Sequence, residues 1–266
     1  IYRGNPYWVP PLESEIHFAM NKNNHPLYAH SEADFFILEE GSKTIGRIAV
    51  VSHKNYSDYY KIPTGFFYYY ECVNNNDGAA ALFTAAVEWC RARQLRTIIG
   101  PRGLLRSNGY GLLVEGFDYL PALGIPYNPP YYADQIESFG FIKETDLISG
   151  YLEPSVQLPE KLFQAADKVK QRDNFHVLKF KKKRELRKWI HELDKIYHQA
   201  FLENPNYYPS THDEFEIMAD NIYRVAIPEL VKIILKEGQT AGFLLAYPNI
   251  GRALQRTKGR LWPFGW

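Results

Sequence analysis

The chain has 266 residues, of which 45% are apolar and 23% charged, so it can form a sizeable core and does not resemble a disordered protein. Its 31 basic and 30 acidic residues almost cancel, which excludes a global charge that would mark nucleic acid as a partner. No stretch contains the ~20 consecutive apolar residues that a membrane-spanning helix needs. The length predicts two domains of ordinary size, 1–153 and 154–266.

Cysteine content and the ends of the chain bear on its location. The two cysteines, Cys72 and Cys90, are too few for the disulfide framework of a small secreted protein, and no basic-then-apolar leader opens the sequence. We therefore expect a cytoplasmic protein. Because it begins with Ile1 and stops at Trp266 within an apolar stretch, we also expect the sequence to be a piece of a longer one.

The first elements are an irregular segment and three strands. Four prolines among polar residues in 1–30 allow at most a short helix there. Residues 34–40 and 44–52 form β-rich runs around a Gly-containing turn, which predicts a hairpin. Residues 65–72 are apolar on both faces, and this is typical of a central strand. The sheet should therefore continue from the hairpin into this third strand.

A helix and a short strand come next. Apolar residues at three- and four-residue spacing predict a helix over 77–93, followed by a strand at 97–101 that should lie parallel to its neighbour. The Gly- and Pro-rich residues 102–130 indicate a long loop, and a loop of that length is usually functional or disordered. A short helix at 131–139 and a final strand at 141–152 complete the first domain.

The second domain repeats part of this order. After a linker at 154–159, we predict a strand at 175–180, helices at 183–201 and 212–225, and a hairpin at 230–247. Both hairpins carry Thr-x-Gly in their second strand, as Thr44 and Gly46 and as Thr240 and Gly242. The chain is therefore predicted to be a tandem repeat whose second copy is incomplete.

The loop before the helix at 77–93 could bind an anion. Unpaired backbone N–H groups and the positive end of a helix dipole favour a diphosphate at such a place. Small residues allow the backbone to approach phosphate closely. The candidate residues are Asn75, Asn76, Gly78, Ala79 and Ala80. An ordinary capped helix after a turn is the alternative.

The order of hairpin, strand, loop, helix and strand resembles the GNAT acyl-CoA N-acyltransferases. The resemblance implies an α/β (α+β type) fold with a mixed central sheet flanked by helices. It also implies that the loop binds the diphosphate of coenzyme A, with Tyr70 and Cys72 beside the rest of the cofactor. The loop matches the family form at Gly78 and Ala80, but has Asn75 where the family has Gln or Arg, and it adds the carboxylate of Asp77.

The chain is more specifically similar to a bacterial tandem-GNAT family that includes ceramide synthase-like proteins. This resemblance implies transfer of an acyl group from acyl-CoA to an amine, possible use of a long-chain acceptor, and no metal. The stretches that carry it are Asn5-x-x-Trp8-Val9-Pro10-Pro11-Leu12, Ile45-Gly46-Arg47-Ile48, Gly100-Pro101, Gly111 to Phe117, Tyr127 to Tyr132, Asp146-Leu147 and Gly259 to Trp266.

N-acylation needs a base for the amine proton and an acid for the thiolate. Glu71, at the end of the central strand, is the candidate base, and Tyr131 or Tyr132 is the candidate acid. An ion-paired carboxylate and packed tyrosines with hydrogen-bonded hydroxyls are the alternatives. The candidate acceptor-binding residues are Leu112, Leu113, Val114, Tyr127 and Asn128.

Two other functions stay open on these grounds. The first is a non-catalytic GNAT repeat that binds an acyl or nucleotide ligand, which Asp77 favours. The second is a transferase like those that move aminoacyl groups from tRNA onto peptidoglycan precursors, although the near-neutral net charge of +1 argues against binding of tRNA. The basic run 179–187 allows a peripheral membrane contact or a solvated helix face.

Overall fold

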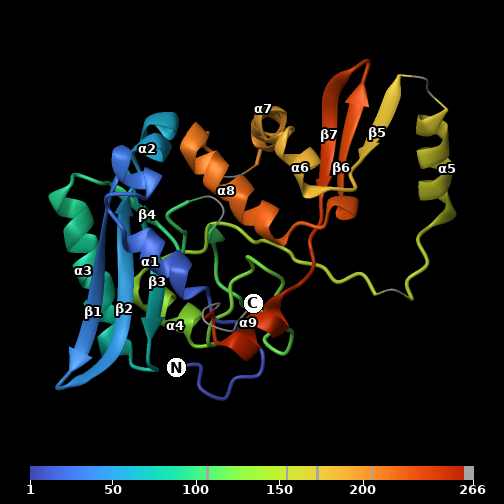
Figure 1. Cartoon of the computed structure of the whole chain (residues 1–266). Coiled ribbons are helices and arrows are strands. Elements are labelled where there is room, and N and C mark those ends of the chain that lie inside the picture. The colour runs from blue at the N-terminus through green and yellow to red at the C-terminus, as the bar shows by residue number, and fades with distance from the viewer. Residues whose placement is uncertain (106–107, 154, 172–173, 205, 261–266) are drawn as a thin grey trace. The chain divides into compact units, whose positions relative to one another are not determined.

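The computed structural model describes residues 1–105, 108–153, 155–171, 174–204 and 206–260 (Figure 1). These residues form two compact units. Unit 1 consists of residues 1–144, 208–214 and the chain from Asn249, and unit 2 consists of residues 145–207 and 215–248. The predicted division into a whole and a partial copy of one fold, at 153/154, remains a prediction. The α/β class is confirmed, with one sheet in each unit.

The sheet of unit 1 is mixed and has the order β1-β2-β3-β4. Strands β1 (Glu32–Glu40) and β2 (Lys43–Ser52) form the predicted antiparallel hairpin. Strand β3 (Thr64–Cys72) lies inside the sheet as predicted, antiparallel to β2 and parallel to β4 (Thr97–Ile99). The helix between them, α3 (Asn76–Ala92), makes the predicted strand-helix-strand crossover.

Helices cover both faces of this sheet (Figure 1). On one face α3 and α4 (Tyr132–Phe139) enclose a core that includes Phe67, Phe83 and Trp89. On the other face the core includes Leu27, Tyr56 and Phe66. Its helices are α1 (Glu13–Met20), the 3-10 turn η1 (Pro26–Ala29) and α2 (Lys54–Tyr60). The apolar character of β3 on both faces therefore reflects two separate cores.

Gly46 lies where helix α3 approaches strand β2 closely. A Cβ atom at this position would lie 2.8 Å from Cδ1 of Leu82 in α3 and 2.9 Å from the carbonyl oxygen of Glu71 in β3. Only a residue without a side chain lets α3 approach β2 so closely.

The predicted strand at 141–152 is wrong. The structure has no strand there, and the apolar side chains of Ile142 and Ile148 are 90% and 96% exposed. A segment of β-forming residues becomes a strand only when a neighbouring strand bonds its backbone N–H and C=O groups. None of the described strands pairs with this segment. Two helices of unit 1, α2 and α9 (Gly251–Thr257), were not predicted because each is too short to show a clear apolar period.

Unit 2 contains a three-stranded sheet with the order β5-β6-β7. Strand β5 (Phe175–Lys179) pairs with the hairpin of β6 (Val231–Lys236) and β7 (Gln239–Leu245), as predicted. A 3-10 turn, η3 (Pro228–Leu230), leads into the hairpin. Helix α5 (Glu160–Lys170) was not predicted, although Leu162, Ala166 and Val169 have helical spacing; it buries none of its residues.

The predicted helix at 183–201 is two helices, α6 (Lys183–Arg187) and α7 (Ile190–Phe201). The break lies at Lys188 and Trp189. The Trp189 backbone stays in the right-handed region, with φ −100° and ψ −3°, and its side chain packs against the core around Phe180 and Ile233. Helix α8 (His212–Val225) has its predicted capping box, in which Glu214 Oε2 accepts the N–H of Thr211 (2.9 Å) and Thr211 Oγ1 accepts that of Glu214 (3.3 Å).

The two hairpins share a register, including an irregularity at the same place. Gly46 pairs with Leu38 and Thr44 with Glu39, so Ile45 is the extra residue of β2. In the same way Gly242 pairs with Ile234 and Thr240 with Leu235, which leaves Ala241 as the extra residue of β7. Both segments are hairpins, as the tandem-repeat hypothesis requires. Their common bulge is a stronger similarity than the shared Thr and Gly alone.

None of the helices in the described part of the chain has the length and apolar character needed to cross a bilayer. The cytoplasmic location remains a prediction.

Candidate functional site

A bulge in β3 decides which way Glu71 faces. Arg47 pairs with Glu71 and Ala49 with Tyr68, so β3 holds one more residue than β2 over this stretch. Tyr69 takes a positive φ of 50° there, a backbone conformation uncommon for residues other than glycine. Because the extra residue reverses the alternation, Tyr70 faces the core under α3 while Glu71 shares a face with Arg47.

The edge of β3 is open beyond its pairing with β4. The two strands pair over residues 64–66 and 97–99, and Arg102 then donates its N–H to the carbonyl oxygen of Phe67 (2.8 Å). Further along β3, the partners come from Tyr131 and helix α4. The N–H of Cys72 donates to the Tyr132 hydroxyl (3.1 Å), and the Tyr131 hydroxyl donates to the carbonyl oxygen of Cys72 (3.0 Å). Gln135 Nε2 donates to the carbonyl oxygen of Val73 (3.0 Å). Side chains thus replace a neighbouring strand here, and the sheet is split at the candidate site.

Glu71 lies at this split and receives hydrogen bonds from both sides. Tyr132 donates to Oε2 (2.6 Å), and Tyr2 donates to Oε1 (3.3 Å). Arg47 Nη2 is 3.7 Å from Oε1, while the Glu71 side chain is 20% exposed. Burial raises the pKa of the Glu71 carboxyl, although Tyr132, Arg47 and Tyr2 act in the opposite direction. The result is a carboxylate that holds a proton more readily than an exposed one.

The structure separates the two tyrosines that the sequence left as alternatives. Tyr132 is buried, and its pKa is raised well above the usual range by burial and by the nearby Glu71 charge. Tyr131 is only half-buried. Its pKa is raised by burial and, to a lesser degree, by the nearby Cys72 and Glu71. Tyr132 is therefore arranged to orient Glu71, whereas Tyr131 is the more accessible hydroxyl.

The loop before α3 is a well-formed helix cap. The side chain of Asn75 accepts the N–H of Gly78 (3.0 Å), so this N–H group already has a partner. Gly78 and Ala79 are buried, and a Cβ atom at Gly78 would lie 3.2 Å from Cδ2 of Leu38. Gly78 therefore lets α3 pack against the sheet. Asn76 and Asp77 are exposed, and Ala80 is half-buried.

Tyr70 and Cys72, predicted beside the cofactor, are buried in the core under α3. Tyr70 donates its hydroxyl proton to Gln135 Oε1 (2.8 Å), and burial raises the pKa of the Cys72 thiol. The backbone of Cys72 lies on the edge of β3 that has no neighbouring strand, where its N–H and carbonyl oxygen bond to Tyr132 and Tyr131.

The predicted acceptor residues lie in the loop that precedes α4. Asn128 is buried and bridges both backbone groups of Leu113, accepting its N–H (2.8 Å) and donating to its carbonyl oxygen (3.2 Å). Leu112 packs against the core that contains Tyr132, while Val114 is 59% exposed. The Tyr127 hydroxyl donates to the carbonyl oxygen of Phe117 (2.9 Å). Asn128 thus holds the loop in shape, and only some of these residues offer an apolar surface.

Sequence reasoning missed three residues that contact Glu71 or its neighbours: Tyr2, Arg47 and Gln135. Arg47 and the segment after Tyr2 belong to stretches that carry the family resemblance, which was the available signal. Gln135 stands four residues after Tyr131 on the same helix, so its position could have been inferred from the helical spacing.

Comparisons with known proteins found two relatives that match over nearly the whole chain. Protein YghO of Escherichia coli (strain K12) is 27% identical over 267 residues, covering 100% of this chain and 67% of that protein. Bacterial ceramide synthase of Caulobacter vibrioides is 28% identical over 268 residues, covering 98% of this chain and 68% of that protein. The chain is homologous to both proteins over its whole length.

No protein-family model matches the chain. A Pyrococcus furiosus protein assigned as an acetyl transferase is 17% identical in sequence, with a TM-score of 0.31, covering 54% of this chain and 81% of that one. Among the stretches that resemble the family, residues 261–266 lie outside the described part of the chain.

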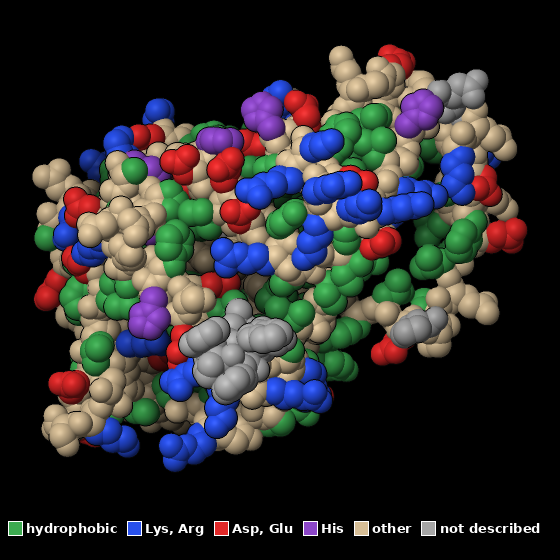
Figure 2. All heavy atoms as spheres, in the orientation of Figure 1, with side chains coloured by type: hydrophobic (Ala, Val, Ile, Leu, Met, Phe, Trp, Pro, Cys, Tyr) green, Lys and Arg blue, Asp and Glu red, His purple; other side chains and the backbone are tan. Residues whose placement is uncertain are grey.

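The chain has a basic surface in unit 2. Figure 2 shows Lys and Arg side chains gathered over the part of unit 2 that contains α6. The residues are exposed, and Lys183 Nζ donates to the carbonyl oxygens of Tyr223 and Arg224. They are Lys179, Lys181, Lys182, Lys183, Arg184 and Arg187.

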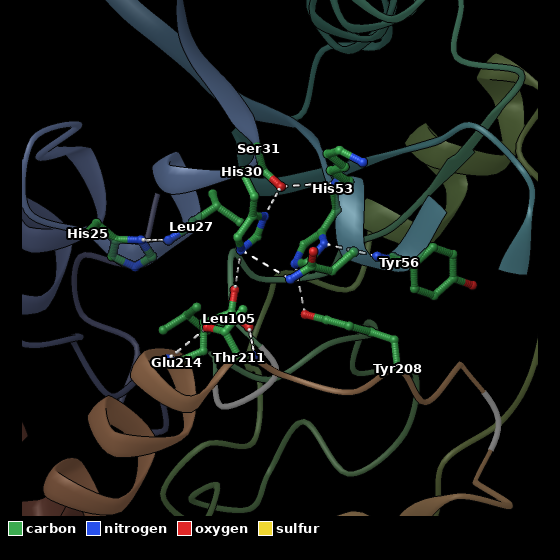
Figure 3. A network of polar contacts seen from close by, with 12 residues as sticks. His25, Leu27, His30, Ser31, His53, Tyr56, Leu105, Tyr208, Thr211 and Glu214 are labelled. Carbon is green, nitrogen blue, oxygen red and sulfur yellow. Dashed lines mark hydrogen bonds and ion pairs between the residues drawn. The ribbon is translucent and has the colours of Figure 1, made fainter. Parts of the chain in front are cut away.

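A second polar cluster lies in unit 1, where histidines hold residues 208–214 (Figure 3). His30 Nε2 lies 3.1 Å from Glu214 Oε1, and His53 Nε2 lies 2.9 Å from the Tyr208 hydroxyl. His53 Nδ1 accepts the N–H of Tyr56 (3.4 Å), which requires a neutral ring with its proton on Nε2. Burial lowers the pKa of His53 to about 3. The cluster is a buried support for this segment.

Two buried histidines of unit 1, His53 and His25, predict a loss of stability in mild acid. Burial lowers the pKa of His53 to about 3 and that of His25 to about 4, from 6.5. Both groups bind protons more readily in the unfolded chain, so their contribution is present above pH 6.5 and is lost as the pH falls below it. Each should cost roughly 1 kcal/mol of unfolding free energy between pH 7 and 5.5. Urea unfolding at the two pH values measures the change.

His53→Gln is the test variant, because it removes one of the two titrating rings. Its unfolding free energy should depend about half as steeply on pH over this range. Glu214, whose lowered pKa is below 4.5, contributes only under more acidic conditions. An unchanged pH dependence in the variant would exclude His53 as a source of the acid sensitivity.

Proposed function

We propose that the chain is a GNAT-type acyltransferase that transfers an acyl group from acyl-CoA to an amine. The observation that carries the proposal is the position of Glu71. Its carboxylate belongs to the part of β3 that extends beyond the pairing with β4. The Tyr132 hydroxyl donates to its Oε2, and the Tyr131 hydroxyl donates to the carbonyl oxygen of the next residue, Cys72. The homology to bacterial ceramide synthase supports acyl transfer, and a long-chain amine is the acceptor that we propose from that relative.

The proposed reaction assigns one proton transfer to each group. The amine nitrogen attacks the thioester carbon while Glu71 takes a proton from the nitrogen. The new C–N bond forms as the C–S bond breaks, and Tyr131 gives its hydroxyl proton to the departing thiolate. Because burial raises the pKa of Glu71, it is a stronger base than an exposed carboxylate once it is ionised. Tyr132 fixes the carboxylate in place.

The cofactor would lie along the open edge of β3, with its diphosphate at the start of α3. A helix N-terminus favours an anion, and Asn76 and Asp77 are exposed there. The N–H of Gly78 is bonded to Asn75, so the proposed contact depends on the first N–H groups of the helix. The N–H groups at the start of the helix fit a diphosphate, but the exposed carboxylate of Asp77 does not, and the small residues Gly78 and Ala79 are buried.

The direct test is formation of an amide. The protein is incubated with acyl-CoA of different chain lengths and a set of primary amines, and thiol release and the amide mass are measured. Amide formation with stoichiometric thiol release is expected. If acyl-CoA binds but no amide forms with acceptors of any chain length, the non-catalytic alternative is favoured. The bonded N–H of Gly78 and the carboxylate of Asp77 are the observations that support that alternative.

Asp77→Asn should bind acyl-CoA roughly 3- to 10-fold more tightly, because it removes a negative charge beside the diphosphate. Calorimetric titration with acyl-CoA measures the affinity. Glu88→Gln is the matched control, since Glu88 is exposed on the same helix three turns away and should have no effect. Equal affinities of the wild type and Asp77→Asn would place the diphosphate elsewhere.

The basic residues over α6 fit a peripheral contact with an anionic membrane, which a long-chain acceptor would make useful. This contact, a cytoplasmic location and the absence of a nucleic-acid partner remain proposals.

A further inference from the structure

The first twelve residues, here called the strap, bring Tyr2 onto Glu71. The Tyr2 hydroxyl lies 3.3 Å from Glu71 Oε1 and 3.4 Å from the carbonyl oxygen of Tyr127. Both of these atoms are acceptors, and a tyrosine hydroxyl has a single proton to donate. The distances are long for an O–H donor, so neither bond has good geometry. Two acceptors thus share one donor that satisfies neither fully.

The strap is fastened by residues from the other end of the chain. Gln255 in α9 donates through Nε2 to the carbonyl oxygens of Pro6 (2.8 Å) and Trp8 (2.9 Å). The rings of Tyr2 and Trp8 stack with centroids 4.7 Å apart, so the position of Trp8 affects that of Tyr2. Asn5 Nδ2 donates to the Tyr127 hydroxyl (3.1 Å). All these residues belong to unit 1.

We propose that the primary amine of the acceptor binds in the place that the Tyr2 hydroxyl occupies, between Glu71 Oε1 and the Tyr127 carbonyl oxygen, after the strap has moved aside. The inference rests on the proposed function and names where the acceptor binds. Tyr2 is therefore a competitor of the acceptor and not a catalytic residue.

The chemistry of the two acceptors fits an ammonium group better than a hydroxyl. An alkylammonium has three N–H donors and a positive charge, so it can bond both oxygens at once and neutralise the carboxylate. Arg47 Nη2, 3.7 Å from Oε1, is the competing cation; its side chain is 44% exposed and can turn toward solvent. After the bound ammonium has lost one proton to solvent, its nitrogen lies beside Glu71, the base that takes the second proton during attack.

The test measures binding of hexylamine by calorimetry to the full chain and to Tyr2→Phe. The variant keeps the ring that stacks on Trp8 but loses the competing hydroxyl, so hexylamine should bind about 2- to 10-fold more tightly. Tyr7→Phe, a change of the same kind on the strap, should bind as the wild type does. Hexyltrimethylammonium, which has no N–H donors, should gain nothing from Tyr2→Phe.

Unchanged or weaker hexylamine binding in Tyr2→Phe would overturn the proposal. An equal increase in affinity for hexylamine and hexyltrimethylammonium would also overturn it, because it would mean only that the variant leaves more space at this place.

A second pair of variants tests the fastening of the strap. Gln255→Ala should also tighten hexylamine binding, because the strap loses two hydrogen bonds and moves aside more easily. Arg256→Ala, the same truncation at the next and exposed residue of α9, should have no effect. Equal binding by the two variants would contradict a role for α9 in covering the site.

Glu71→Gln separates this inference from the proposed function. If amide formation survives in that variant, the proposed base is wrong. If amide formation is lost but Tyr2→Phe binds hexylamine no more tightly than the wild type, the base stands and only the acceptor position is wrong.

Discussion

Replacing Glu71 with Gln should lower the turnover of acyl transfer by about 10²–10⁴-fold, with little change in acyl-CoA affinity. Gln has nearly the same shape and can still accept the hydrogen bond of Tyr132, but it cannot take a proton from the amine. The acyl-CoA contacts that we propose lie on the backbone edge of β3 and at the start of α3, away from the Glu71 side chain. Steady-state kinetics with varied acyl-CoA and amine separate the two effects.

Asp34→Asn is a matched control for that variant. Asp34 is also a carboxylate on the same sheet, bonded to Lys22 and to the indole of Trp89, and it lies on β1. Its replacement should lower stability slightly and leave turnover unchanged. Full activity of Glu71→Gln would remove this residue from the mechanism and leave water or the ionisation of the amine itself to provide the base.

The two tyrosines of α4 should differ in the kind of defect that their loss causes. Tyr131→Phe removes the proposed acid, so turnover should fall about 10²–10⁴-fold. The loss should be smaller for an acyl donor whose leaving thiol is more acidic, because such a thiolate needs no proton. Comparison of acyl-CoA with an activated aryl thioester measures this dependence.

Tyr132→Phe should instead shift the pH profile. The Tyr132 hydroxyl lowers the pKa of Glu71 by donating to Oε2, so its removal raises that pKa. Since the base acts in its ionised form, the acidic limb of kcat/KM should move to higher pH. If Tyr131→Phe moved the limb and Tyr132→Phe reduced turnover at every pH, the two roles would be exchanged.

Local pattern was enough for most elements of the sheets. The hairpin turns, the apolar β3 and the periodic α3 each carry their signal within a few residues, because turn chemistry and side-chain periodicity are local properties. The capping box of Thr211 and Glu214 was equally visible. Position in the chain also placed Glu71 at a strand end and the two tyrosines at a helix start, although their alternative roles stayed open.

Tertiary structure decided the remainder, for physical reasons that a linear pattern does not contain. The segment 141–152 has the composition of a strand, but a strand needs a partner, and none of the described strands provides one. The side of the sheet on which Glu71 lies depends on one extra residue at Tyr69, which reverses the alternation. Tyr2 and Gln255, more than 250 residues apart, reach the same site only because the chain after Asn249 returns to unit 1.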